Sequence, residues 1–193
     1  MQARGTLMIE HRLIERMLSV IKGISGEAQS KHTLDPALVD LAVDFIRVYA
    51  DRTHHGKEEN ILFRRLDNKP LIAEDRQVMN ELVKEHAFGR QTTQALVYAN
   101  DRYRKGDETA LTDVVDKLQI LIEFYPDHIK KEDKVFFPKS KNYFTDEEDQ
   151  AMLAEFLEFD RKMIHEKYKS LVEALEMKRI PNSAEKKVTT LRS

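Results

Sequence analysis

The sequence predicts an all-α protein, an up-down-up-down four-helix bundle with an additional C-terminal helix. Three observations lead to this prediction. The chain has 193 residues but only 6 Gly and 5 Pro, which is few for short strands joined by turns. Leu, Ala, Glu, Lys and Arg, which favour helices, are abundant. Apolar residues recur at helical spacing in long segments that short polar connections separate.

The first four helices are expected over residues 6–24, 35–66, 72–104 and 107–138. The segment 23–34 contains Gly and Ser and is expected to form a loop. Asp35 and Pro36 then give a start signal, with the Asp as N-cap and the Pro in the first turn. The stretches DNKP and KGDE end the second and third helices. Pro126 is expected to kink the fourth helix or to interrupt its hydrogen-bond ladder.

A fifth helix is expected over residues 146–178. Thr145 and Glu148 have the spacing of a capping box at its start. Because four helices already complete a bundle, the fifth should pack on the outside or mediate self-association. The expected organisation is therefore a bundle over residues 1–140, an additional helix over 141–180 and a polar tail over 181–193 without periodicity.

Composition excludes several classes of function. A net charge of −2 provides no overall field that would select nucleic acid. The absence of Cys excludes disulfides, iron–sulfur clusters and thiolate zinc sites. The N-terminal stretch lacks the features of a secretory signal, and no apolar run is long enough to cross a membrane. These features favour a cytoplasmic protein.

Two stretches that lie far apart share one pattern. HHGKEENILF and HIKKEDKVFF, aligned on His55 and His128, both read H-x-K-x-E-x-x-(L/V)-F. The chain has 7 His, for which about 0.7 His-x-x-x-Glu pairs are expected by chance at this helical spacing. It contains four such pairs, namely His11/Glu15, His54/Glu58, His55/Glu59 and His128/Glu132. The excess indicates a specific role for some of them.

Helical phase at about 100° per residue indicates which members of these pairs face inward. His55 and Glu59 fall near the apolar face of the second helix, whereas His54 falls on the solvent side and Glu58 points further outward. In the other helices the inward residues are His11, His86, His128 and Glu132.

Each of the four helices thus places one histidine inward, and two of them add a glutamate. Buried carboxylates are rare unless they are paired or bound to a cation, so one or two metal ions are expected. Four imidazoles and two carboxylates suit two cations of intermediate softness that the carboxylates bridge. Iron is the first choice, and zinc and manganese remain alternatives. The chain has neither the His-Glu-x-x-His motif of zinc proteases nor the Glu-x-x-His pair of ferritin-like bundles.

The order His11, His55-x-x-x-Glu59, His86, His128-x-x-x-Glu132 and then FFP resembles the hemerythrin-like, or HHE cation-binding, domain over roughly residues 5–140. The resemblance implies a non-haem di-iron centre in a four-helix bundle. It implies that Glu59 and Glu132 bridge the irons, that His11 and His55 serve one iron, and that His86 and His128 serve the other. The family handles dioxygen, peroxide, nitric oxide or iron itself.

The sequence also departs from the oxygen-carrying hemerythrins. Their third helix has a His-x-x-x-His pair, whereas in this chain His86 is followed by Arg90, and their last carboxylate comes five residues after its His rather than four. With an imidazole missing, one iron is expected to keep an open position or to take another ligand, for which Glu15 and Glu58 are candidates. An open position favours peroxide or oxygen chemistry over reversible oxygen carriage.

Two neighbouring residues have two interpretations each. Tyr125 lies one turn before His128 and either donates a hydrogen bond toward the site or only packs there. Gly89, one turn after His86, either leaves room beside the metal or allows two helices to approach.

The leading hypothesis is a di-iron protein that binds or reacts with dioxygen, peroxide or nitric oxide. Its alternatives are a non-enzymatic iron or oxygen sensor, in which the fifth helix signals to a partner, and a purely structural metal site. The expected partner is a small ligand, and neither nucleic acid nor a membrane is expected to bind. The chain is also a candidate for forming a homo-oligomer through the C-terminal helix.

Overall fold

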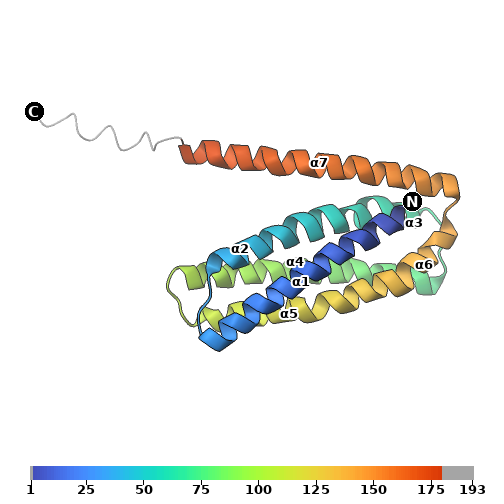
Figure 1. Ribbon diagram of the computed structural model, residues 1–193. Coiled ribbons are helices and arrows are strands. Elements are labelled where there is room, and N and C mark those ends of the chain that lie inside the picture. Colours follow the sequence, from blue (N-terminus) through green and yellow to red (C-terminus); the bar gives the residue numbers. More distant parts are fainter. Residues whose placement is uncertain (1, 180–193) are drawn as a thin grey trace, which may run out of the picture.

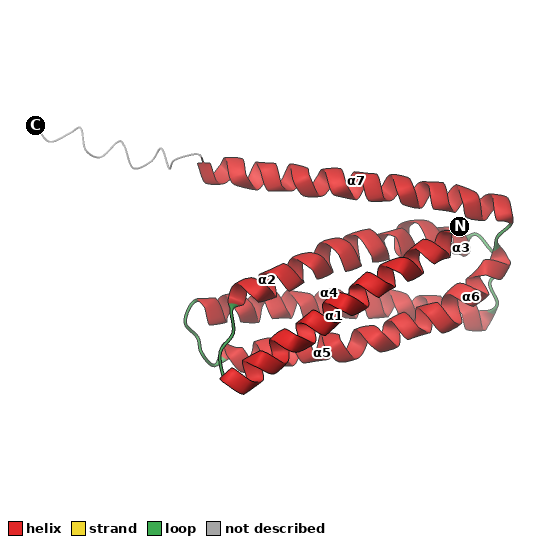
Figure 2. Cartoon of the chain, in the orientation of Figure 1, coloured by secondary structure: helices red, strands yellow, loops and turns green. Residues whose placement is uncertain are grey.

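The computed structural model describes residues 2–179, and these residues are almost entirely helical without any strand (Figure 2). The predicted all-α class is therefore confirmed for this part of the chain. Four long helical segments lie alongside one another, and a further long helix runs along one side of them (Figure 1). The predicted polar tail lies outside the described residues.

The first helix, α1 (Ala3–Lys31), is longer than the sequence indicated. It continues through Gly23 and Gly26, so the expected loop over residues 23–34 is wrong in its first part. A side-chain carbon at either glycine would meet nothing within 4 Å, whereas Ser25 and Ala28 are buried and continue the inward stripe. Packing of this stripe outweighs the low helix propensity of glycine, which costs about 1 kcal/mol per residue.

The second long segment consists of α2 (Pro36–Phe45), the π-helical segments η1 (Ile46–His55) and η2 (Glu58–Phe63), and α3 (Arg64–Asp67). Its start is as predicted: the Asp35 carboxylate accepts a hydrogen bond from the backbone N–H of Ala37, and Pro36 opens the helix.

The π-helical turns change which side chains of this segment face inward. Residues at every fourth position are buried, namely Ile46, Ala50, His54, Glu58, Leu62 and Leu66. In an α-helix such a series drifts by about 40° per step, because each residue advances by about 100°. The wider i→i+5 turns reduce the advance per residue and keep the series on one face. Two buried residues of this series, His54 and Glu58, are polar.

The third and fourth segments agree closely with the sequence prediction. The third is α4 (Ala73–Arg104). The fourth consists of α5 (Ala110–Lys131), the π-helical η3 (Glu132–Phe136), α6 (Phe137–Ser140) and a short 3-10 turn, η4 (Lys141–Tyr143). Helix α5 continues through Pro126, so the proline does not end the helix.

The fifth helix, α7 (Asp146–Arg179), begins with the predicted capping box. The Thr145 hydroxyl accepts a hydrogen bond from the backbone N–H of Glu148, and the Glu148 carboxylate accepts one from the N–H of Thr145. Near its start, α7 packs against α1 and the second segment through the buried side chains of Met152 and Phe156. No helix among the described residues is long and apolar enough to cross a membrane.

Two apolar clusters make up the core. One contains Ile14, Leu18, Val114, Leu118 and Leu121 with their neighbours, and the other contains Leu7, Leu62, Leu66, Leu82 and Phe136 with theirs. On α1, on the second segment and on α4, the inward histidines lie between residues of the two clusters in sequence, and on the fourth segment Glu132 lies between Ile129 and Phe136. The core is therefore divided by a buried polar layer.

Candidate metal centre

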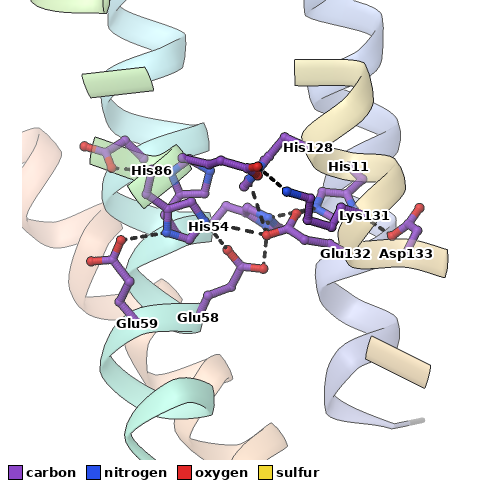
Figure 3. A network of polar contacts seen from close by, with 12 residues as sticks. His11, His54, Glu58, Glu59, His86, His128, Lys131, Glu132 and Asp133 are labelled. Atoms are coloured by element: carbon purple, nitrogen blue, oxygen red, sulfur yellow. Dashed lines mark hydrogen bonds and ion pairs between the residues drawn. The ribbon is translucent and has the colours of Figure 1, made fainter. Parts of the chain in front are cut away.

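Five histidines from the four long segments meet in this polar layer, and Figure 3 labels His11, His54, His86 and His128 among them. They are His11 on α1, His54 and His55 on η1, His86 on α4 and His128 on α5. None is more than 2% exposed. Two glutamates with no exposed surface, Glu58 on η2 and Glu132 on η3, lie among them. Such a set of buried donors requires protons or cations to balance the carboxylates.

The donor atoms form two groups. Atoms of His55, His86 and His128 lie within 4.8 Å of one another, and we call these residues the three-histidine group. Atoms of His11, His54, Glu58 and Glu132 are equally close to one another, and we call the two histidines among them the His11–His54 pair. The His55 ring stacks on His86 with centroids 3.9 Å apart, and Nε2 of His11 is 2.9 Å from Nε2 of His54.

Glu58 presents one oxygen to each group. Its Oε1 is 3.7 Å from Nε2 of His54, and its Oε2 is 3.3 Å from Nε2 of His86. The carboxylate therefore lies between the His11–His54 pair and the three-histidine group.

Glu132 repeats this arrangement from a different helix. Its Oε2 is 3.1 Å from Nε2 of His11, and its Oε1 is 3.3 Å from Nε2 of His128. Two carboxylates that each face two clusters of imidazoles have the arrangement that bridging of two cations requires.

The outer nitrogens of the histidines face carboxylates. The Nδ1 contacts are His11 with Asp133 at 2.7 Å, His54 with Glu10 at 2.8 Å, His86 with Glu59 at 2.7 Å and His128 with Glu85 at 2.8 Å. Nδ1 of His55 is 3.5 Å from Asp51. An imidazole that donates its Nδ1–H to a carboxylate keeps the lone pair of Nε2 for a metal, and this second partner also fixes the orientation of the ring.

Each of these outer carboxylates pairs with a cation. Arg12 pairs with Asp133, Lys57 with Glu10, Lys131 with Glu85, and Arg90 with both Glu59 and Asp51. Four cations thus face five outer carboxylates, because Glu59 and Asp51 share Arg90. The repeated order of imidazole, carboxylate and cation explains why Nε2, rather than Nδ1, faces the interior.

The buried atoms at the centre test whether a metal fits. Both oxygens of Glu58, both oxygens of Glu132, and Nε2 of His86 and of His128 have no hydrogen-bond partner among the described residues. The imidazole–carboxylate distances of 3.1–3.7 Å are charge contacts that lack hydrogen-bond geometry. Buried polar groups are rarely left unsatisfied, and divalent cations would satisfy all of these atoms together. The residues fit a metal centre.

The pKa values of the central histidines depend on the balance between burial and the neighbouring carboxylates. Burial lowers the pKa of His11, but the hydrogen bond with Asp133 and the close contact with the Glu132 carboxylate outweigh this effect and raise it to about 10. The pKa of His86 is raised well above its ordinary value, because contacts with Glu132, Glu58 and Glu59 outweigh burial. Burial and neighbouring imidazoles lower the pKa of His55. Positive charge therefore collects beside the two buried carboxylates.

The structure corrects the predicted orientation of His54 and Glu58. His54 was expected on the solvent side and Glu58 further outward, but they are 1% and 0% exposed and lie at the centre. The error arises from the assumed advance of 100° per residue, which the π-helical turns of η1 and η2 do not follow. The signal that could have revealed both residues is the series at every fourth position from Ile46 to Leu66.

Glu59 is displaced from the position that the sequence indicated. Its side chain is 27% exposed, and its Oε1 contacts Nδ1 of His86 and the Arg90 guanidinium. It therefore supports a histidine from outside instead of lying between the two groups. The other inward predictions, His11, His55, His86, His128 and Glu132, all lie at the centre.

The remaining candidates lie at different distances from the centre. Glu15 is on the solvent side, where it pairs with Arg12 at 3.2 Å. Arg90 stands where the third helix lacks its second histidine, and His55, from the second segment, completes a group of three imidazoles instead. Tyr125 is buried next to the His55 ring, with centroids 6.5 Å apart.

Fold and site together define a class, namely a helical protein with a buried cation site built from imidazoles and carboxylates. A family model, the hemerythrin HHE cation binding domain, matches residues 3–140. The match covers more than half of the chain, so the chain belongs to this family, whose domain binds cations. Neither a search of curated proteins nor a search of solved structures gave a match. Helix α7 lies outside the matched region.

Proposed function

We propose that this protein is a non-haem di-iron protein that binds or reacts with dioxygen, peroxide or nitric oxide. The observation that carries the proposal is the pair of buried carboxylates, Glu58 and Glu132, whose unsatisfied oxygens each face two clusters of imidazoles. Nitrogen and oxygen donors of this kind suit iron. The family match supports a cation site, and the resemblance to di-iron hemerythrins supports a metal pair.

The proposed ligand set differs from the one that the resemblance implied. The three-histidine group would hold one iron and the His11–His54 pair the other, and Glu58 and Glu132 would bridge them. Glu58 thus takes the bridging role that the resemblance gave to Glu59. The iron beside the His11–His54 pair has one imidazole fewer, so an open position is expected there rather than at the three-histidine group. Bound iron would supply redox chemistry and a coordination position for a small ligand.

The protein's own residues would hold and shield this pair. Aromatic rings stack on three of the ligand imidazoles: Phe137 on His11, Phe63 on His86 and Phe124 on His128. The rings limit the access of water and keep the imidazoles in place. The apolar clusters on both sides of the polar layer give the site a low dielectric constant, which strengthens every charge interaction within it.

The wider architecture is part of the proposal. Packing of α1 against α5, and of α4 against α5 and α2, supports an up-down-up-down order of the four long segments. We also propose a cytoplasmic protein with a small ligand as its partner, and self-association through α7 as a candidate. Exposed apolar residues on α7, such as Leu157 and Ile164, support the last point.

A second candidate function is a non-enzymatic iron or oxygen sensor. It is favoured by one observation: Lys57, which is completely buried, contacts both Glu10 next to His54 and Asp160 on α7. This contact joins the candidate centre to a helix outside the matched domain.

Addition of peroxide to anaerobically reconstituted ferrous protein separates these candidates. Rapid consumption of many equivalents per chain supports the reactive di-iron protein. A metal-dependent change in folding or partner binding, without turnover, supports the sensor. A protein that retains only zinc after expression in iron-rich medium would contradict the di-iron proposal.

A further inference from the structure

One arginine on α4 contacts two of the outer carboxylates at once. Nε of Arg90 donates to Oδ1 of Asp51 on η1 at 2.7 Å, and its Nη2 donates to Oε1 of Glu59 on η2 at 2.7 Å. The same two oxygens face imidazoles. Oε1 of Glu59 is 2.7 Å from Nδ1 of His86, and Oδ1 of Asp51 is 3.5 Å from Nδ1 of His55. A single guanidinium therefore stands behind two of the central histidines.

Each of the other three central histidines has a carboxylate and a cation that it does not share with a second histidine. These series are His11 with Asp133 and Arg12, His54 with Glu10 and Lys57, and His128 with Glu85 and Lys131. Both histidines that share Arg90 belong to the three-histidine group. Their rings stack with centroids 3.9 Å apart and an angle of 11° between their planes. The shared cation thus serves the two rings that lie closest together.

A guanidinium is suited to hold two carboxylates in a fixed relation to each other. Its donors lie in one rigid plane, so bonds from Nε and from Nη2 set the directions of both acceptors together. A lysine ammonium is a point charge on a flexible stem and does not fix two directions in this way. The side chains of Arg90, Asp51 and Glu59 are 39%, 23% and 27% exposed. Because this shell is only partly buried, its geometry depends on these bonds more than on packing.

His55 has the weakest outer support of the five central histidines. Its Nδ1 has no hydrogen bond among the described residues, whereas the other four Nδ1 atoms lie 2.7–2.8 Å from a carboxylate oxygen. The Asp51 oxygen that faces it is the one that Arg90 holds. An outer carboxylate fixes the orientation of a metal-ligating imidazole and strengthens its donor nitrogen. Arg90 therefore sets how much support Asp51 can give to His55.

We propose that Arg90 is a positioning residue of the three-histidine group: it couples the outer carboxylates of His55 and His86, so that these two imidazoles bind or release a metal ion as a unit. The proposal rests on the metal centre proposed above and concerns a side chain outside its ligand set. The third imidazole of the group, His128, is supported separately by Glu85 and serves as an internal control.

The first test measures the rings in metal-free protein with ¹⁵N-labelled histidine, in which NMR follows the exchange of each Nδ1–H with solvent. Asp51→Ala removes one anchor of Arg90 and should accelerate exchange at His86 about fivefold, the effect of losing a partly exposed ion pair. Exchange at His128 should not change. In Arg90→Lys protein, Asp51→Ala should have no further effect at His86. An effect that persists there would pass through the stacked rings and overturn the role of Arg90.

The second test is a zinc titration of Arg90→Lys, which keeps the positive charge and removes only the fork. One of two zinc ions should bind about tenfold more weakly, with the other ion and Tm little changed. Arg47→Lys is the matched control, because Arg47 is exposed, lines the same pocket and bonds to Gln94 instead of a carboxylate.

Unchanged affinity in Arg90→Lys would overturn the proposal, and so would an equal loss at both zinc ions, which would indicate general loosening. Ring exchange that depends on Arg90 in a protein that binds no zinc would support the coupling of the two rings and contradict the metal centre.

Discussion

Every inward histidine of this protein has an outer carboxylate, and every outer carboxylate has a cation. His11, Asp133 and Arg12 form one such series, and His54, Glu10 and Lys57 form another. This arrangement assigns different roles to residues that are adjacent in the sequence. Glu58 belongs to the centre and Glu59 to the surrounding shell, although both stand four residues after a histidine.

The adjacent pair Glu58 and Glu59 gives the first prediction. Glu58→Gln removes a charge that faces both groups, so bound iron should fall below two ions per chain. Glu59→Gln should retain two ions but weaken their binding about 10–100-fold, because only the support of His86 is altered. Iron analysis after dialysis, combined with competition against a chelator, measures both effects.

Two histidine variants control this comparison. His54→Ala should lose iron, and His165→Ala, an exposed position on α7, should not. Loss of stoichiometry in Glu59→Gln with full binding in Glu58→Gln would make Glu59 the bridging carboxylate and contradict the role proposed for Glu58.

The raised pKa values of His11 and His86 give the second prediction. His11 has a pKa of about 10 and His86 a pKa well above its ordinary value, so both are protonated at neutral pH in metal-free protein. A metal requires the neutral imidazole, so loading should release about one proton from each. Apparent affinity should then rise with pH through the neutral range. Calorimetry of Zn²⁺ binding in buffers of different ionisation enthalpy measures the release, and a buffer-independent heat would contradict it.

Most of the centre could be predicted from residue type and spacing. Buried His11, His86, His128 and Glu132 follow from ordinary helical phase, because α1, α4 and most of the fourth segment have regular α-helical turns. The prediction from helical phase is wrong in the second segment. The width of a helical turn cannot be read from the sequence, and the wider turns of this segment move His54 and Glu58 inward. His55 remains inward as well, which supplies the imidazole that the third helix lacks.

At the scale of elements, the wide turns of η1 and η2 place two consecutive histidines at the centre. In a regular α-helix His54 and His55 would diverge by about 100°. In this protein their ring centroids are 5.6 Å apart, and one belongs to each group of donors. Unusual helical turns of this kind frequently occur at functional sites. The wrongly predicted loop at Gly23 and Gly26 has a different cause, since there packing of the inward stripe outweighs local propensity.

Helix α7 is joined to the second segment through two neighbouring contacts. Gly56 permits the close approach of Phe159, because a side-chain carbon at Gly56 would lie 2.9 Å from that ring. Asp160, one residue further, is 2.7 Å from the buried ammonium of Lys57. Lys57 in turn contacts Glu10, which supports His54. The order from α7 to the centre is therefore Asp160, Lys57, Glu10 and His54.

This connection gives the third prediction. Asp160→Asn should loosen α7, because Lys57 loses one of its two carboxylates, while Glu10 still holds His54. The Asp160 side chain is 35% exposed, so the loss of stability should be about 1 kcal/mol at most. Faster hydrogen exchange along α7, with unchanged iron content, is expected.

Glu158→Gln serves as the matched control, because Glu158 is exposed on the same helix and, among the described residues, pairs with Arg161 alone. Equal exchange in wild type and Asp160→Asn would show that the contact does not hold α7.

At the scale of the whole molecule, the polar layer lies between two apolar clusters. Four helical segments contribute to the layer, so a metal pair within it would tie them all together. The two buried carboxylates are costly in a low-dielectric core unless they are balanced. Cations shared by both carboxylates would offset the free-energy cost of burying them.

The most direct test of the proposed metal pair is a crystal structure of the iron-loaded protein with anomalous diffraction measured at the iron edge. Two anomalous peaks are expected in each chain. One should lie within the three-histidine group of His55, His86 and His128, and the other should lie beside His11 and His54, with Glu58 and Glu132 between the peaks. A single peak, or a peak coordinated by Glu59 in place of Glu58, would contradict the proposed centre.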